Sequence, residues 1–173
     1  AYNNVGPQLA LDMFVSFPSP VDFQPVIGKM SGSEDEVQLN VSEDAQLSAF
    51  VFKTITDPYA GRVNYFRIYS GTMKADSRVY NSNRGREERI GSISLIDGKK
   101  YINVEKIVAG DFGAVMKLSE TTTNDTLCDE SNKIVLPPIE FPKPVISMAV
   151  MPKTQGDDEK LSTMLTRMVV EDP

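Results

Sequence analysis

The stretch TDPYAGRVNYFRIYSG, residues 56–71, decides the fold, because two runs of β-forming residues flank a cluster of turn residues. Pro58 fixes one backbone angle of the turn, and Gly61 relieves strain where the chain reverses. Side chains alternate between the two faces of a strand, so Phe66 and Ile68 share one face. The stretch therefore predicts an antiparallel hairpin that buries Phe66 and Ile68 in a core.

The opposite face of the second strand carries Tyr65, Arg67 and Tyr69, and Arg62 opens the strand. Such a face could stack on bases or pair with phosphates, and it could equally pack against a neighbouring domain. The pattern alone favours domain packing. Arg62, Tyr65, Arg67 and Tyr69 are therefore candidates for an interdomain or RNA face.

Short β-branched and aromatic runs continue on both sides of the hairpin, from Leu47 to about Leu136. Turn residues divide these runs, and Asp97-Gly98 is a good signal for a two-residue hairpin turn. Short strands with frequent turns are typical of an antiparallel barrel or sandwich. The predicted strands are 47–55, 62–70, 77–81, 87–96, 99–106, 112–118 and 133–136.

The N-terminal part of the chain has a different texture. Apolar residues at helical spacing predict a helix over 6–17, with Gly6 and Pro7 suited to its start. Prolines at 18 and 20 end that helix. Residues 23–46 are acidic and poor in apolar residues, which predicts a linker with at most one edge strand.

The C-terminal part follows a proline-rich segment, LPPIEFPKP, at 136–144. Residues 145–151 form a strand-like run, and a helix with acidic residues at its start is predicted after residue 156. One strand and one helix cannot close a two-layer core. We therefore expect this tail to begin another domain, and the sequence to be an excerpt of a longer protein.

Charge is distributed unevenly along the chain, whose net charge is −6. Residues 62–106 contain ten basic and five acidic residues, so this segment carries +5 and the remainder −11. A polyanion responds to local charge, within a Debye length of about 8 Å. The candidates for RNA contact in this segment are Arg84, Arg86, Arg89, Lys99 and Lys100.

The three arginines are grouped around Gly85 in NSNRGREER, residues 81–89. This segment is a predicted loop tip, where long basic side chains have no core to pack against. A phosphate contact and a merely solvated loop are both compatible with this pattern.

The sequence contains no recognisable catalytic constellation. It has no histidine, which excludes Ser-His-Asp and Cys-His arrangements and a typical zinc site. Adjacent Glu87 and Glu88 point to opposite faces of a strand and are predicted to be solvated charges. The single cysteine, Cys128, is predicted to be a small buried residue. Asp125 and its acidic neighbours at 129–130 lack EF-hand spacing.

Nucleotide-binding motifs are missing as well. There is no GxxxxGK[ST] phosphate loop, and Val135 stands where an Asn-Lys-x-Asp guanine motif would need aspartate. We therefore expect no catalytic residue, no cofactor and no metal in this chain. It has no signal segment and no apolar stretch long enough to span a membrane, so we expect a cytoplasmic protein without membrane partners.

Four successive motifs resemble the elongation factor G family of translational GTPases. AFVFKTITDPYAGRVNYFRIYSG (49–71) and AGDFGAVMKLSETTTNDTL (109–127) are similar to segments of domain II. PIEFPKPVISMAVMPKTQGDDEKLSTMLTRMVVEDP (138–173) resembles the entry into domain III, and YNNVGPQLALDMFVSFPSPVD (2–22) resembles the end of the GTPase domain. SNRGREERIG and GKKYINVEKIVAGDFGAV are similar to the second-copy branch of the family.

The resemblance implies a mainly β fold, in which a translation-factor-type barrel is flanked by an N-terminal helix and a partial ferredoxin-like β-α unit. The implied domains are 1–22 (end of the GTPase domain), 23–46 (linker), 47–137 (domain II) and 138–173 (start of domain III). It implies a non-catalytic fragment that docks on small-subunit ribosomal RNA and packs against the GTPase domain during translocation.

In such a family the missing GTPase domain binds GTP and Mg and hydrolyses the nucleotide, and domain III is a further partner. The alternative is a protein-interaction barrel unrelated to the ribosome. One departure from the family is Asn124, where relatives usually have glycine. Asparagine tolerates a left-handed turn better than most residues, so the fold need not suffer.

Overall fold

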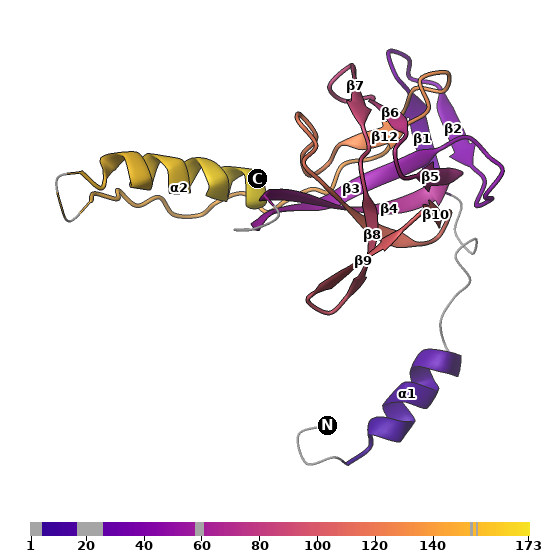
Figure 1. Cartoon of the computed structure of the whole chain (residues 1–173), viewed down its shortest axis with the longest axis horizontal. Coiled ribbons are helices and arrows are strands. Elements are labelled where there is room, and N and C mark those ends of the chain that lie inside the picture. The colour runs from indigo at the N-terminus through magenta and orange to yellow at the C-terminus, as the bar shows by residue number, and fades with distance from the viewer. Residues whose placement is uncertain (1–4, 17–25, 58–60, 153, 155) are drawn as a thin grey trace.

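The computed structural model describes residues 5–16, 26–57, 61–152, 154 and 156–173. Its main element is one antiparallel sheet of eight strands, whose strands wrap around a single body in Figure 1. In spatial order they are β7 (Arg86–Arg89), β6 (Arg78–Asn81), β12 (Thr126–Cys128), β3 (Ser48–Asp57), β4 (Gly61–Ser70), β11 (Phe112–Met116), β8 (Ile93–Asp97) and β9 (Lys100–Val104).

Two smaller antiparallel sheets complete the barrel-like body. One pairs β5 (Thr72–Lys74) with β10 (Lys106–Val108). The other has the order β13 (Ile134–Val135), β1 (Val26–Met30), β2 (Glu36–Leu39). The predicted mainly β, antiparallel barrel class is therefore confirmed.

The predicted central hairpin is formed by β3 and β4, which pair from Ser48↔Ser70 to Asp57↔Gly61. Gly61 adopts a left-handed φ of 77°, as a chain reversal at this point requires, whereas Pro58 lies outside the described residues. Phe66 and Ile68 are fully buried, as predicted. They form the main core with residues from other strands and from positions next to them: Leu47, Ala49, Val51, Met73, Val79, Ile90, Ile93, Ile107, Val115, Leu118 and Leu127.

Cys128 is buried as predicted, and its sulfur lies 3.0 Å from Ser82 Oγ. Burial, partly offset by the contact with Ser82, raises the pKa of this thiol. A protonated, enclosed thiol is a poor nucleophile, so the structure gives this residue a packing role.

Two predicted strands are each divided in the structure. Residues 87–96 separate into β7, which pairs with β6, and β8, which pairs with β11. Residues 99–106 separate into β9, which pairs with β8, and β10, which pairs with β5. In each case one predicted strand pairs with two different sheet neighbours, and composition alone does not show where the chain changes partner.

The turn between β8 and β9 is shifted by one residue from the prediction. Asp97 pairs with Lys100, so Gly98 and Lys99 form the two-residue turn. Gly98 adopts a left-handed φ of 58°. Glycine at the first turn position therefore sets the register, and Asp97 remains in the strand.

The prediction of a linker with one edge strand at 23–46 is wrong for its described part, residues 26–46. This part forms the hairpin β1–β2, which is joined by β13. Its Leu39 packs with Phe50, Ile134 and Leu136 in a second buried cluster. The segment has few apolar residues because the barrel supplies most of that cluster.

The N-terminal helix, α1 (Pro7–Ser16), starts at the predicted proline, and none of its residues is buried. The C-terminal helix, α2 (Asp158–Glu171), carries Asp158 and Glu159 in its first turn, as predicted. Its last turn is attached to the barrel, because Lys53 Nζ donates to Glu171 O (2.7 Å) and Thr56 N donates to Glu171 Oε1 (2.8 Å).

The strand predicted at 145–151 is not formed, and no strand among the described residues lies alongside it. A strand needs a neighbour for its backbone hydrogen bonds, so β-propensity alone does not produce one. In the part of the chain that the structure describes, no helix has the length and apolar character needed to cross a membrane.

Candidate nucleic-acid interface

The loop between β6 and β7, residues 82–85, presents the first of the candidate arginines. Asn81 organises this loop with its side-chain oxygen and with its backbone carbonyl. Its Oδ1 accepts hydrogen bonds from Asn83 N (3.1 Å) and Arg84 N (3.0 Å), and its carbonyl accepts one from Gly85 N (2.8 Å). The loop is therefore held by a local hydrogen-bond pattern typical of asparagine turns.

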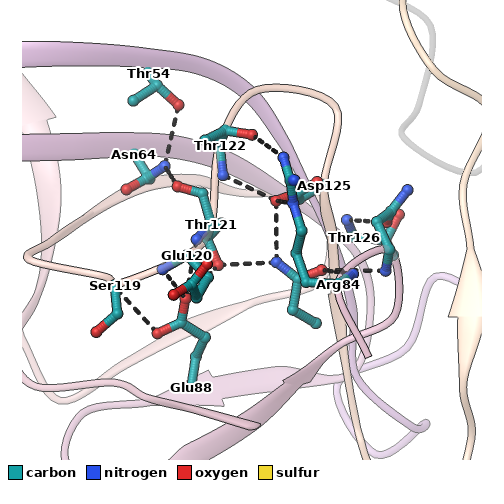
Figure 2. Close-up of polar contacts among 12 residues, drawn as sticks. Thr54, Asn64, Arg84, Glu88, Ser119, Glu120, Thr121, Thr122, Asp125 and Thr126 are labelled. Carbon is teal, nitrogen blue, oxygen red and sulfur yellow. Dashed lines mark hydrogen bonds and ion pairs between the residues drawn. The ribbon is translucent and has the colours of Figure 1, made fainter. Parts of the chain in front are cut away.

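The Arg84 side chain is held in place by a buried carboxylate, contrary to the expectation that it has nothing in the fold to pack against. Its Nε donates to Asp125 Oδ2 at 3.2 Å, and its Nη2 donates to Thr122 Oγ1 at 2.7 Å (Figure 2). The Asp125 side chain is only 5% exposed, whereas that of Arg84 is 47% exposed. The guanidinium therefore anchors the loop and still presents half of its surface to solvent.

Arg86 and Arg89 lie at the two ends of β7, the edge strand of the large sheet. Three residues apart in a strand, they project to opposite faces. In the described part of the chain, the one ion pair of Arg86 is an exposed contact with Glu120 at 3.7 Å. Arg89 lies directly opposite Arg78 across the sheet and forms no ion pair with another described residue. Both arginines are available to an anion that approaches this edge.

Lys99 and Lys100 lie at the tip of the β8–β9 hairpin and are exposed. Figure 1 shows this tip and the β6–β7 loop at opposite sides of the body. The structure therefore does not bring the five candidate RNA contacts together, and only Arg84, Arg86 and Arg89 share one edge.

A buried carboxylate beneath this edge was missed by the sequence interpretation, which predicted Glu88 to be solvated. Glu88 is 5% exposed. Its oxygens accept hydrogen bonds from the backbone N–H groups of Ser119 (3.1 Å), Glu120 (2.8 Å) and Thr121 (2.9 Å), and from the Thr121 hydroxyl (3.0 Å) (Figure 2). Glu88 lies two residues before buried Ile90, so alternation places both side chains on the same face. This pattern could have predicted the burial of Glu88.

Electrostatics at Glu88 reflect two opposing effects. Burial raises the pKa of the carboxyl group, but the hydrogen bonds from Glu120, Ser119 and Thr121 outweigh it, and the pKa lies below its ordinary value. Hydrogen bonds to the charged form of a carboxylate have this effect. Glu88 is therefore an anionic anchor for loop 119–121.

Asp125 joins this anchor to the arginine loop. Its Oδ2 accepts hydrogen bonds from Thr122 N (2.9 Å) and Asn81 Nδ2 (3.0 Å) in addition to Arg84. The Asn81 amide also donates to Thr121 Oγ1 at 3.0 Å. Loops 81–85 and 119–125 are thus one hydrogen-bonded unit. Among the described residues, no three histidine, cysteine or acidic side chains lie close enough together to hold a metal ion.

Asn124 adopts the left-handed conformation expected for it, with φ 74°. Its side chain also makes two reciprocal hydrogen bonds, since Oδ1 accepts from Ile139 N (2.9 Å) and Nδ2 donates to Ile139 O (3.1 Å). Asparagine therefore contributes two side-chain hydrogen bonds that glycine at this position could not make.

Replacing Asn124 is expected to separate these two contributions. Asn124→Gly keeps the conformation and loses the side-chain bonds, so it should destabilise the fold by about 1 kcal/mol. Asn124→Ala adds left-handed strain and should cost roughly 1 kcal/mol more. Urea unfolding of both variants measures the difference. Equal stability of the alanine and glycine variants would contradict the assigned conformation.

The face of β4 that was predicted to lie outside carries a cluster of rings. We define the Arg67 patch as Phe52, Tyr65, Arg67, Tyr69 and Phe112. The Arg67 guanidinium lies 5.0 Å from the Tyr69 ring centre and 5.3 Å from that of Phe112. Phe52 stacks on Tyr65 at 6.4 Å and meets Phe112 edge-on at 5.8 Å. Three of the four face candidates therefore belong to one patch.

Arg62, the fourth face candidate, is not part of this patch. Its Nη1 donates to Ser119 O at 3.1 Å, which ties the start of β4 to loop 119–121. The structure thus gives Arg62 a contact within the chain.

Tyr65 provides a pH-dependent test of the patch. Burial, followed by the 2.7 Å hydrogen bond with the Tyr101 hydroxyl, raises the pKa of Tyr65 to about 12. Because this pKa is raised, the protonated Tyr65 hydroxyl stabilises the folded state fully below the ordinary value of 10. That stabilisation is lost as the pH rises from 10 through 12.

Absorbance titration at 295 nm, compared with Tyr65→Phe, should show one tyrosine that ionises near pH 12. The stability advantage of the wild-type chain over Tyr65→Phe should decline above pH 10. Tyr101→Phe removes one cause of the shift and should move the titration of Tyr65 toward 10. A Tyr65 titration at pH 10 in the wild-type chain would disagree with this geometry.

Comparisons with known proteins agree with this fold. Residues 46–130 match the family model described as elongation factor G domain 2, and residues 141–173 match that of elongation factor G, domain III. A crystal structure of a protein from Thermus thermophilus is similar, with a TM-score of 0.69 and 26% sequence identity. The match covers 96% of this chain and 22% of that chain.

The antiparallel barrel-like body and the two matched domains define a part of a translation elongation factor. The chain belongs to the elongation factor G family. Domains II and III in that family are parts of a translational GTPase.

Proposed function

We propose that this chain is a non-catalytic docking module of an elongation factor G-like GTPase. Residues 47–137 act as domain II and residues 138–173 as the start of domain III, while residues 1–22 end the GTPase domain. In the cytoplasm, the module docks on small-subunit ribosomal RNA during translocation and packs against its own GTPase domain, which binds GTP and Mg.

The observation that carries the RNA contact is the construction of the β6–β7 edge. Asn81 and Asp125 hold the loop in place, so little conformational entropy remains to be lost on binding. Arg86 and Arg89 stay exposed on both faces of an edge strand. An ordered Arg84, with two exposed arginines beside it on an accessible edge, suits contacts with phosphate groups, which position a protein on nucleic acid.

Lys99 and Lys100 are assigned a secondary contact, because they lie on another side of the body (Figure 1). A folded ribosomal RNA could reach both sides, but a short RNA helix would meet only one. The β7 edge presents three arginines, whereas the β8–β9 tip presents two lysines. We therefore assign the primary RNA contact to the β7 edge.

The experiment is cosedimentation of the full-length protein with isolated small ribosomal subunits. The double variant Arg86→Glu/Arg89→Glu should bind at least about tenfold more weakly, since two phosphate contacts are replaced by repulsion. Lys29→Glu/Lys160→Glu is the matched control, because it changes net charge equally at exposed sites outside the basic segment. Unchanged binding of the arginine variant would instead favour a protein-interaction barrel unrelated to the ribosome.

A further inference from the structure

Arg67 has an unusual environment for a cation. Its side chain is half-buried, and its Nε is buried without a hydrogen-bond partner. Among the residues that the structure describes, no ion pair or side-chain hydrogen bond reaches this guanidinium, which lies over the rings of Tyr69 and Phe112. Buried polar groups are nearly always hydrogen-bonded, so the buried Nε–H group calls for an acceptor from outside the described chain.

The surroundings of Arg67 indicate the kind of acceptor. Surfaces that bind phosphate backbones combine several cations. Within the Arg67 patch Arg67 is the single cation, and Lys53, on the adjacent strand, is already bonded to Glu171. Phe52 packs against both Tyr65 and Phe112, which leaves fewer ring faces of the patch free for base stacking. An arginine among aromatic rings is typical of the centre of a protein–protein interface.

We propose that the Arg67 patch binds an apolar protein surface that presents one aspartate or glutamate carboxylate to the Arg67 guanidinium. The planar guanidinium matches a carboxylate in a two-bond geometry, and the rings already restrict its position. Phe112, which is 52% exposed, supplies the apolar contact beside it. This inference rests on the proposed function in one respect, namely that the module packs against its own GTPase domain.

The test uses the whole 173-residue chain and two short probes. The first is the blocked tripeptide acetyl-Leu-Glu-Leu-amide, and the second is its glutamine counterpart. Titration is followed by the NMR signal of the Arg67 Nε–H group. We expect a saturable shift with the glutamate peptide and at least about tenfold weaker binding of the glutamine peptide, because a charge-assisted hydrogen bond is lost.

Two variants keep the test independent of folding. Arg67→Lys retains the charge but loses the planar fork, and Phe112→Ala removes an exposed ring. Each should weaken the glutamate peptide about tenfold, measured on backbone amides of β4, while the thermal unfolding midpoint stays within a few degrees. Equal binding of the two peptides, or no shift with either, would overturn the proposal.

Inorganic phosphate and an RNA hexamer serve as competing probes. A response of Arg67 to these probes and not to the glutamate peptide would make the patch an RNA surface and would also overturn the proposal. The arginine variant of β7 separates this inference from the proposed RNA contact. Arg86→Glu/Arg89→Glu should lose small-subunit binding and keep full peptide binding, so each proposal can fail without the other.

Discussion

Replacing Glu88 with alanine is expected to destabilise the fold by about 3 kcal/mol, because three backbone N–H groups of loop 119–121 lose their acceptor. Each buried donor left without a partner costs on the order of 1–3 kcal/mol, and partial exposure of this loop lowers the sum. The matched control is Glu87→Ala. Glu87 is exposed and pairs with exposed Arg78, so its loss should cost under about 1 kcal/mol.

Acid pH should remove the same stabilisation without a mutation. Because the pKa of Glu88 is lowered from its ordinary value of 4.5, its contribution is complete above pH 4.5 and is lost as the pH falls through the folded value. Urea unfolding between pH 7 and pH 3 should show the wild-type advantage over Glu88→Gln shrinking with acidification. A pH-independent difference would contradict the role of the ionised carboxylate.

Gly71→Ala should also cost about 3 kcal/mol, by a steric mechanism. Gly71 has φ +76°, and an added Cβ would lie 2.7 Å from Ala45 O and from two backbone atoms of Leu47. The neighbouring atoms belong to the main chain and cannot rotate away. Left-handed strain contributes roughly 1 kcal/mol and the overlap roughly 1–3 kcal/mol.

Gly98→Ala is the control for Gly71. Gly98 also has positive φ, at 58°, but nothing lies within 4 Å of an added Cβ. This variant should show the conformational cost alone, about 1 kcal/mol. Thermal or urea unfolding measures both. If the two variants were equally stable, the close approach of loop 45–47 to Gly71 would be wrong.

The sequence predicted the parts of the fold that local chemistry determines. The β3–β4 hairpin follows from turn residues and alternation, and the buried positions of Phe66 and Ile68 follow from the same alternation. Helices α1 and α2 follow from apolar spacing, from Pro7, and from acidic residues at the start of α2. Each of these signals lies within a few residues of the element that it predicts.

What the sequence did not predict depends on contacts between distant segments. Strands β1 and β2 complete their core with Phe50, Ile134 and Leu136, which lie elsewhere in the chain. Residues 145–151 have strand propensity but no strand beside them among the described residues. Propensity is a weak guide when a neighbouring segment decides the outcome.

The candidate site shows the same limit. Arg84, Arg86 and Arg89 were identified from charge clustering, but the acid beneath Arg84 lies 41 residues further along the chain. Glu88 contacts a loop more than 30 residues away, so its burial could be suspected only from its phase with Ile90. Lys99 and Lys100 carry the same positive charge as the arginines but lie on another side of the body.

The salt dependence of small-subunit binding tests the central claim most directly, because it reports the number of phosphate contacts. For the full-length protein, the logarithm of the association constant should fall linearly with the logarithm of salt concentration. Replacing Arg86 and Arg89 with glutamine should reduce that slope by about 1.8, or about 0.9 for each contact with duplex RNA. An unchanged slope, with binding as tight as that of the wild-type protein, would contradict an RNA interface at this edge of the barrel.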